Sequence, residues 1–413
     1  MTDLTFVPLP ALASGASVVR SAAAAEPAVV FGREAVFVDI GGSALEALAQ
    51  PPASRRELRA GQVLAAVVQK GRLFQRAYPD VPVLRDRGRF LLVGLDPGHP
   101  ALAAPPAEPC FAAYRVGPGD EVFRDLDPAA LRVRRDPAIE AVLGGLSTAT
   151  FRATLEELVR LRNRLSTGSL FREAVGLCRA RLDAMGYRTT PQEFDMPGGR
   201  SCNLLALPDA AGPAAVLVLG HLDSVNHAEG PEGLAPGADD NGSGSAGVIA
   251  MAEALVALKD RLSVGFALLG GEEQGLHGSQ HLLATLPEDA RAALRAVINM
   301  DMIGTLNRRP DGGAVSGVLL EGAEVSRGVV AALAQQAASW TDLAVQTSFH
   351  PFASDHVPFI QAGLPAVLTI EGADQANDQI HGAGDTLDRI DDALAHRILR
   401  MNTAYVASLA SAA

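Results

Sequence analysis

In this sequence, imidazole and carboxylate side chains follow short apolar runs: AAVLVLG is followed by His221 and Asp223, VGFALLGG by Glu272 and Glu273, and AVINM by Asp301. Asp239 and Asp240 precede an expected helix in PGADDNGSGSAG, and His381 lies in the loop after PAVLTIEG. Each one alone has an ordinary explanation, such as a helix cap, a turn or a solvated surface pair. Several carboxylates gathered at one place, however, repel one another strongly unless cations lie between them. Bound divalent metal ions would remove that repulsion.

The types of these side chains indicate which metal would bind. Imidazole mixed with carboxylate, without cysteine, suits zinc, with cobalt or manganese as substitutes. Two histidines and three carboxylates suit two ions better than one, because a shared carboxylate can bridge a pair. One glutamate then remains as a general base that takes a proton from water. The pattern therefore predicts metal-assisted hydrolysis.

The elements that must position these residues alternate between strands and helices after residue 135. Two helices come first: TATFRATLEELVRLRNR, capped by Ser147 or Thr148, and SLFREAVGLCRARLDAMGY, which ends near Gly186. Strands such as AAVLVLG, VGFALLG, AVINMD and PAVLTI then alternate with helices. This order predicts an α/β fold with a largely parallel, mixed central sheet covered by helices on both faces. Ligands of such sheets bind beyond the carboxyl ends of the strands, where we expect these side chains to meet.

Residues 1–135 have a different pattern. Short β-like runs, AVFVDI, FLLVGL and CFAAYRV, are mixed with stretches that we interpret as helical, SALEALAQ and AGQVLAAVVQ. We therefore expect a small α+β accessory domain over residues 1–135 and a catalytic domain over residues 136–413. The accessory domain holds no catalytic constellation, and either stabilises or covers the catalytic part.

Bulk composition excludes several classes of protein. The chain of 413 residues is 48% apolar and 20% charged, which is typical of a globular protein with a sizeable core. Its net charge of −12 argues against a nucleic-acid partner, which requires clustered positive charge. A run of about 18 uncharged apolar residues, as a membrane span needs, is not found.

Cysteine usage and the first residues give weaker signals. Cys110, Cys178 and Cys202 form neither a disulfide framework nor a zinc knuckle, so a Cys178–Cys202 bridge and three free thiols both stay open. The first twenty residues lack the basic start of a signal peptide, which favours a cytoplasmic location. A leader that had been removed would instead leave an exported protein.

Six motifs follow one another in a fixed order: GHLDSV, GADDNGSG, GGEEQGLHGS, NMDMIG, SDHVPF and HGAGDT. In order and spacing, over residues 137–413, they resemble the dizinc aminopeptidase family of metallopeptidases, which includes bacterial leucyl aminopeptidases and glutamate carboxypeptidases. The resemblance implies a zinc exopeptidase-like fold, two zinc ions, and removal of N-terminal residues from a peptide substrate.

The resemblance also implies a role for each site residue. The metal ligands would be His221 and Asp301 for one zinc, Glu273 and His381 for the other, and Asp240 as the bridge. Glu272 would be the general base, and Asp223 would hold the ring of His221 and fix its tautomer. The family further implies a cis peptide bond between Asp240 and Asn241.

Two positions depart from the family pattern. Many members carry a tyrosine directly before the last histidine to stabilise the oxyanion, where this chain has Ile380. Gly382 stands where many members have threonine. Three further histidines lie near these motifs: His356 has a place expected near the substrate pocket, His277 has a structural role, and His227 lies on a loop that could line the cleft.

Other functions remain open from sequence. A carboxypeptidase, dipeptidase or amidohydrolase could use the same dizinc site, and a single-zinc glutaminyl cyclase is a further relative, although one zinc needs fewer ligands. A non-catalytic binding module of this fold would show gaps among its ligands, and the set is complete. A serine hydrolase would carry a G-x-S-x-G elbow after a strand, which is absent. Side-chain specificity and oligomeric state are not determined by sequence.

Overall fold

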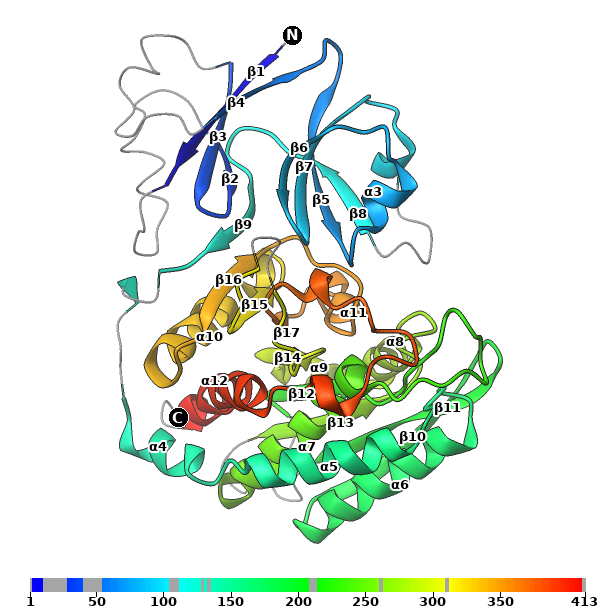
Figure 1. Ribbon diagram of the computed structural model, residues 1–413. Coiled ribbons are helices and arrows are strands. Elements are labelled where there is room, and N and C mark those ends of the chain that lie inside the picture. The colour runs from blue at the N-terminus through cyan, green and yellow to red at the C-terminus, as the bar shows by residue number, and fades with distance from the viewer. Residues whose placement is uncertain are drawn as a thin grey trace.

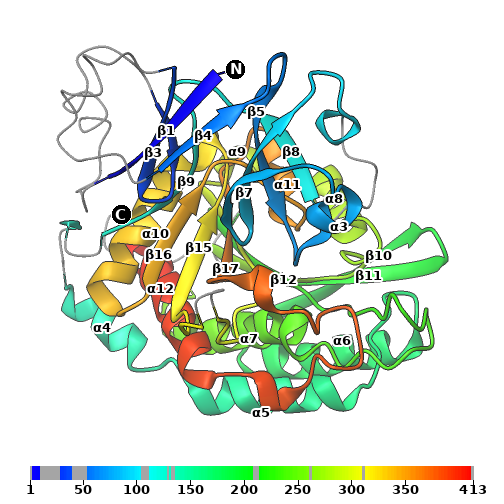
Figure 2. The same ribbon diagram turned by 45° about the horizontal axis from the view of Figure 1, so that its top comes forward.

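The computed structural model of the chain describes residues 2–9, 28–39, 54–103, 111–127, 130–131, 135–207, 214–259, 263–308 and 312–410. Two expectations, the helix SALEALAQ and the state of Cys110, lie outside these residues. In Figures 1 and 2 the strands of residues 1–135, which we call the N-terminal region, lie against one side of a larger α/β body formed by the rest of the chain.

The described strands run from one region into the other as a single central sheet, with a second, smaller sheet beside it. The central sheet has the order β10-β11-β13-β12-β14-β17-β15-β16-β9-β2-β3-β1-β4. Its strands are β1 (Thr2–Pro8), β2 (Val29–Phe31), β3 (Glu34–Val38), β4 (Ser54–Leu58), β9 (Glu121–Asp125), β10 (Arg188–Met196), β11 (Gly199–Leu207), β12 (Val216–His221), β13 (Val264–Leu269), β14 (Ala296–Met300), β15 (Gly317–Glu321), β16 (Ala344–Ser348) and β17 (Ala366–Glu371).

The middle of this sheet is parallel. β12 pairs in parallel with both β13 and β14, and β14 pairs in parallel with β17. On either side β11 is antiparallel to β13, and β15 is antiparallel to β17. The mixed central sheet expected from the sequence is therefore confirmed, its middle strands are parallel, and the carboxyl ends of four strands lie at one edge.

Helices cover both faces of the sheet. Successive residues of a strand point to opposite faces, and in the central strands the residues on both faces are mostly apolar. Val216 and Val218 of β12 join a core with α5, α6, α7, α10 and α12, whereas Leu217 and Leu219 join a second core on the opposite face with residues of α8 and α11. The helices are α3 (Leu73–Ala77), α4 (Pro137–Leu143), α5 (Thr148–Arg160), α6 (Ser169–Ala184), α7 (Gly244–Leu255), α8 (His277–Thr285), α9 (Glu288–Ala293), α10 (Arg327–Trp340), α11 (His356–Gln361) and α12 (Asp392–Ala410).

The first two long helices, α5 and α6, have the ends that the sequence predicted. The Ser147 hydroxyl accepts the Thr150 N–H at 3.0 Å and caps α5. α6 stops just before Gly186, whose φ of +79° suits glycine. Both boundaries confirm the predictions made from the sequence.

One prediction for the N-terminal region is wrong. The stretch AGQVLAAVVQ forms a strand, β5 (Val63–Gln69), in a sheet of order β6-β7-β5-β8 with β6 (Val83–Arg87), β7 (Phe90–Leu95) and β8 (Phe111–Arg115). β5 pairs with β7 on one side and β8 on the other, and nearly all its residues are buried. A short, fully buried strand gives a continuous apolar run that periodicity alone cannot tell from a buried helix.

The structure also bears on the cysteines and on membrane spans. Cys178 and Cys202 are buried free thiols, so the bridge left open from the sequence is not formed. Among the described residues, Ala238–Leu258 has the length and composition of a membrane span, but 78% of its most apolar window is buried within the protein. This helical segment contains α7, which packs in the core beside the central strands.

Candidate metal centre

The site residues gather where the parallel strands end. His221 is the last residue of β12, Asp301 follows β14 directly, and Glu272 and Glu273 follow β13 after a tight turn. Asp240 lies in the helical turn Ala238–Ser243 that leads into α7. Since these strands are parallel, the residues that follow them emerge at the same edge of the sheet.

One group of ligand atoms surrounds His221. Its Nε2 atom lies 3.2 Å from Oδ1 of Asp240 and 3.5 Å from Oδ1 of Asp301. All three side chains are almost completely buried, and they could hold one metal ion between them. Glu272 stands further back, with its Oε2 atom 4.0 Å from the same imidazole nitrogen.

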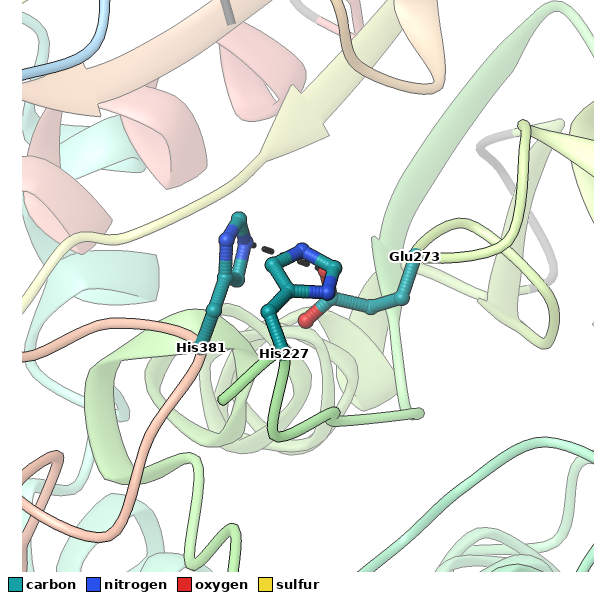
Figure 3. A group of neighbouring side chains, drawn as sticks. All are labelled: His227, Glu273 and His381. Carbon is teal, nitrogen blue, oxygen red and sulfur yellow. Dashed lines mark ion pairs between the residues drawn. The ribbon is translucent and has the colours of Figure 1, made fainter. Parts of the chain in front are cut away.

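A second group surrounds His381. Its Nε2 atom lies 3.0 Å from Oδ2 of Asp240 and 3.0 Å from Oε2 of Glu273. The two oxygens of Asp240 thus face the two histidines, one each, so that Asp240 lies between the groups. Figure 3 shows that His227 also faces this second group, with its ring edge-on to His381 at 4.5 Å between centroids. His227, Glu273 and His381 together could hold an ion.

Although short nitrogen–oxygen distances join the two groups, five of these buried atoms make no well-formed hydrogen bond among the described residues. They are His221 Nε2, Asp240 Oδ2, Glu273 Oε1, Asp301 Oδ1 and His381 Nε2. An orphaned buried polar atom costs roughly 1–3 kcal/mol, and a native protein rarely keeps five of them in one place. Nitrogen and oxygen donors of this kind, aimed at one another, fit zinc.

The histidines offset part of the negative charge of the cluster. Burial opposes protonation of His221, but Glu272 and Asp301 outweigh burial and raise its pKa well above the ordinary value. The pKa of His381 is likewise raised, against burial, by Glu273 and Asp240. Without metal, imidazolium groups therefore supply part of the positive charge beside the carboxylates, and a metal ion must displace their protons.

Asp223 anchors the backbone of the two adjacent glutamates. Its carboxylate is fully buried and accepts the backbone N–H of Glu272 at 3.4 Å and of Glu273 at 3.3 Å. One carboxylate oxygen also lies 3.6 Å from Nδ1 of His221. The family resemblance implied only that Asp223 holds the ring of His221; in the structure the backbone carbonyl of Asp223 lies 3.2 Å from Nδ1 of that ring, and the carboxylate anchors both glutamates.

The backbone at Asp240 is held in place by a neighbouring carboxylate. The Asp385 carboxylate accepts the N–H groups of Asp239 and Asp240, each at 2.9 Å. The peptide bond between Asp240 and Asn241 is cis, as expected from the family resemblance. Asp239 points away from the ligand groups and accepts the Gly304 N–H, so its role is structural.

A buried arginine fixes the segment between β12 and this turn. The guanidinium of Arg164 is fully buried and donates to the backbone carbonyls of Leu222, Pro236 and Gly237. Gly244 then begins α7 so close to the sheet that a Cβ there would lie 2.4 Å from the Met300 carbonyl. This close approach explains why the motif GADDNGSG requires glycine at that position.

The residues of SDHVPF lie at the start of α11, beside Asp301. Ser354 donates its hydroxyl to Oδ2 of Asp301 at 2.7 Å. Asp355, which sequence reasoning did not single out, is fully buried, and burial raises its pKa to about 7. His356 is buried beside Glu321, 3.5 Å from its carboxylate, and lies outside both ligand groups.

His277, Ile380 and Lys70 lie at the margins of the centre. His277 begins α8, outside both ligand groups, and Ile380 packs against an apolar cluster that includes residues of the N-terminal region. Lys70, directly after β5 in the N-terminal region, lies close enough for its charge to contribute to lowering the pKa values of Asp240 and Asp301. Burial alone would raise the pKa values of these two carboxyl groups, and the neighbouring histidines are the main cause of their lowering. No sequence signal connected Lys70 to the centre.

Comparisons with known proteins agree with this fold and site. Residues 204–406 match the model of peptidase family M28. Leupeptin-inactivating enzyme 1 of Streptomyces exfoliatus is 32% identical over 194 residues, which cover 45% of this chain and 43% of that protein. Leucine aminopeptidase 1 of Grosmannia clavigera is 28% identical over 297 residues, which cover 68% of this chain and 72% of that protein.

Two solved structures share the fold. The zinc aminopeptidase BSAP from Bacillus subtilis has a TM-score of 0.57 and 16% identity, covering 64% of this chain and 95% of that chain. The Legionella pneumophila LapA aminopeptidase has a TM-score of 0.59 and 17% identity, covering 85% of this chain and 99% of that chain. At these identities the likeness is one of fold.

The sheet has the fold of these solved aminopeptidase structures, and the candidate ligand groups lie at the ends of its parallel strands. Over residues 204–406 the chain is similar to peptidase family M28. These matches agree with the family and the enzyme class expected from the six ordered motifs. The match to the first relative spans less than half of that protein's length.

Proposed function

We propose that the protein is a zinc-dependent aminopeptidase that removes N-terminal residues from peptides. The observation that carries this proposal is the position of Asp240, which faces His221 with one oxygen and His381 with the other. The names of the relatives, which include leucine aminopeptidases, support the same activity.

The residues present fit two zinc ions. His221 and Asp301 would hold one ion, Glu273 and His381 would hold the other, and Asp240 would serve both. When bound, zinc supplies Lewis acidity, which polarises a carbonyl and lowers the pKa of water. Cobalt or manganese would substitute, because both accept the same mixture of imidazole and carboxylate.

Glu272 would act as the general base. Its side chain lies beside the ligand groups, and only 9% of it is exposed. Burial raises its pKa well above the ordinary value, with Glu273 and Asp301 adding to the rise against the influence of His221. A carboxylate at this position would take a proton from attacking water and return it to the leaving amine.

Asp223 would keep this base in place. Because its carboxylate accepts the N–H of Glu272 and of Glu273, it fixes the backbone from which base and ligand project. The excess of carboxylates at this edge also suits a substrate with a free, positively charged α-amino group. These features favour cleavage next to the substrate N-terminus over the carboxypeptidase and amidohydrolase alternatives.

The proposal is tested by measuring the metal content of the full-length protein together with hydrolysis of aminoacyl-anilides and of the same anilides blocked at the amino group. We expect about two zinc ions per chain and cleavage only of the free-amine substrates. Cleavage of blocked but not free substrates would overturn the aminopeptidase assignment. A chain that binds no zinc would overturn the metallopeptidase mechanism as a whole.

A further inference from the structure

The N-terminal region is joined to the rest of the protein by more than a linker. β9 pairs antiparallel with β16 of the C-terminal sheet and parallel with β2 of the N-terminal region, so one sheet runs through both. Figure 1 shows β9 between the strands of the N-terminal region and β16. At this junction the hairpin between β6 and β7 presents Gly88 and Arg89 toward the C-terminal sheet.

Arg89 is the charged residue at the centre of this junction. Its side chain is only 4% exposed, and its Nη2 atom lies 2.9 Å from Oε2 of Glu321. Its Nη1 atom contacts Oδ2 of Asp374, so one guanidinium joins two carboxylates that are 53 positions apart in sequence. Both partners are almost completely buried. A planar guanidinium can serve two carboxylates at fixed angles, which a lysine ammonium cannot reproduce.

The Glu321 contact leads to one ligand group. The other oxygen of Glu321 accepts the Phe352 N–H at 2.8 Å, which ties β15 to the segment before α11. Two residues further on, Ser354 donates to Asp301 at 2.7 Å. Arg89 is therefore connected through Glu321 and this segment to a predicted ligand of the first zinc.

The Asp374 contact leads to the other ligand group. The carbonyl of Asp374 accepts the Asn377 N–H at 2.9 Å, and the Asn377 side chain donates to Asp239 at 2.9 Å. Asp239 precedes the bridging Asp240, and His381 follows in the same loop as Asn377. Arg89 is thus connected through Asp374 to the loop that carries a predicted ligand of the second zinc.

The neighbouring backbone is shaped to bring Arg89 to this position. Gly88 has a φ of +78°, and a Cβ at Gly88 would lie 2.2 Å from the side chain of Gln375. The Gln69 side chain donates to the Gly88 carbonyl at 3.0 Å, and its backbone N–H to the Arg89 carbonyl at 2.9 Å. The hairpin is therefore fixed on the β5 side before it reaches the catalytic part.

We propose that Arg89 is a positioning residue for the metal centre, by which the N-terminal region holds the Asp301 and His381 segments at the separation that two zinc ions require. This inference rests on the proposed function, because it concerns the same pair of ions. It gives residues 1–135 a task in building the centre. Removing the guanidinium should loosen both segments without removing any ligand.

The test compares zinc retention in full-length Arg89→Lys, Asp374→Asn and Arg85→Lys proteins, measured by competition with a chelator. Arg85 is the matched control, because it pairs with Glu34 entirely within the N-terminal region. Circular dichroism establishes that each variant is folded. Asp374→Asn supplies the same test with the Arg89–Glu321 contact left in place, should Arg89→Lys fail to fold.

We expect Arg89→Lys and Asp374→Asn to bind zinc at least about tenfold more weakly, in the range seen when residues behind metal ligands are changed. Arg85→Lys should bind zinc as the wild type does. Wild-type zinc affinity in both Arg89→Lys and Asp374→Asn would overturn the inference, as would an equal loss in Arg85→Lys. A wild-type protein that binds no zinc at all would instead refute the proposed function, so the two failures are distinguishable.

Discussion

Replacing Asp223 by asparagine is the perturbation whose effect follows most directly from the geometry. The carboxylate accepts one N–H from Glu272 and one from Glu273, at 3.4 and 3.3 Å, from a fully buried position. Asparagine has the same shape but only one acceptor oxygen, so its amide group must face one of the two N–H donors. One hydrogen bond is lost and two donors are brought together.

The size of the effect can be worked from these contacts. A hydrogen bond to a charged group contributes about 1.5–3 kcal/mol, and the long distances here favour the lower end. A loss of about 1.5–3 kcal/mol corresponds to roughly 10- to 100-fold in an equilibrium or a rate. Because Asp223 supports both base and ligand, the loss should appear in zinc affinity and in kcat/KM together.

The assay measures zinc affinity by chelator competition and kcat/KM on an aminoacyl-anilide for Asp223→Asn. Asp195→Asn is the matched control, because Asp195 pairs with Arg200 on an exposed part of β10–β11. The control should match the wild type in both measurements. An Asp223→Asn enzyme with both values within about twofold of wild type would refute the reasoning, since it would fall outside the expected range.

Two further predictions concern the histidines. His381→Ala should release one of the two zinc ions. His227→Ala removes an exposed ring that lies edge-on to His381, so this variant should keep both ions and lose only a few-fold in zinc affinity. Zinc content after dialysis tests this prediction, and equal losses of zinc in the two variants would contradict it. The raised pKa values of His221 and His381 stabilise the metal-free fold below about pH 6.5, and this contribution is lost as pH rises through the folded-state values. The Tm difference between zinc-loaded and chelated protein should therefore widen from pH 6.5 upward, and a constant or narrowing difference would count against the charge balance described for the centre.

The sequence predicted the catalytic part well because its signals are local. Apolar runs followed by His221 or Asp301 end buried parallel strands, and parallel strands bring their carboxyl ends to one edge. Ser147 and Gly186 marked helix ends through capping chemistry that needs only neighbouring residues. Roles for the individual ligands came from the family resemblance and stay predictions.

What the sequence could not predict depends on contacts between distant segments. Arg89 meets Glu321 and Asp374 across 232 and 285 positions, and no local pattern announces such a pair. His227 gave no signal beyond its place after GHLDSV, because its approach to His381 depends on how two loops fold together. β5 was interpreted as a helix since its buried run lacks alternation.

The N-terminal region illustrates the same limit. Its strands AVFVDI, FLLVGL and CFAAYRV correspond to β3, β7 and β8. The pairing of β9 with β16, which joins the sheets, has no counterpart in the sequence pattern. The domain boundary near residue 135 stays a prediction, and the continuous sheet and the Arg89 contacts suggest that the two parts function as one unit.

The most direct test of the central claim is a paired measurement of zinc content and kcat for Glu272→Gln. Glu272 lies outside both ligand groups, so the variant should retain wild-type zinc while kcat falls by about 10²- to 10⁴-fold, as expected for a lost general base. Glu288→Gln, at the exposed start of α9, should leave both values unchanged. A Glu272→Gln enzyme that keeps its zinc and turns over near the wild-type rate would contradict the account.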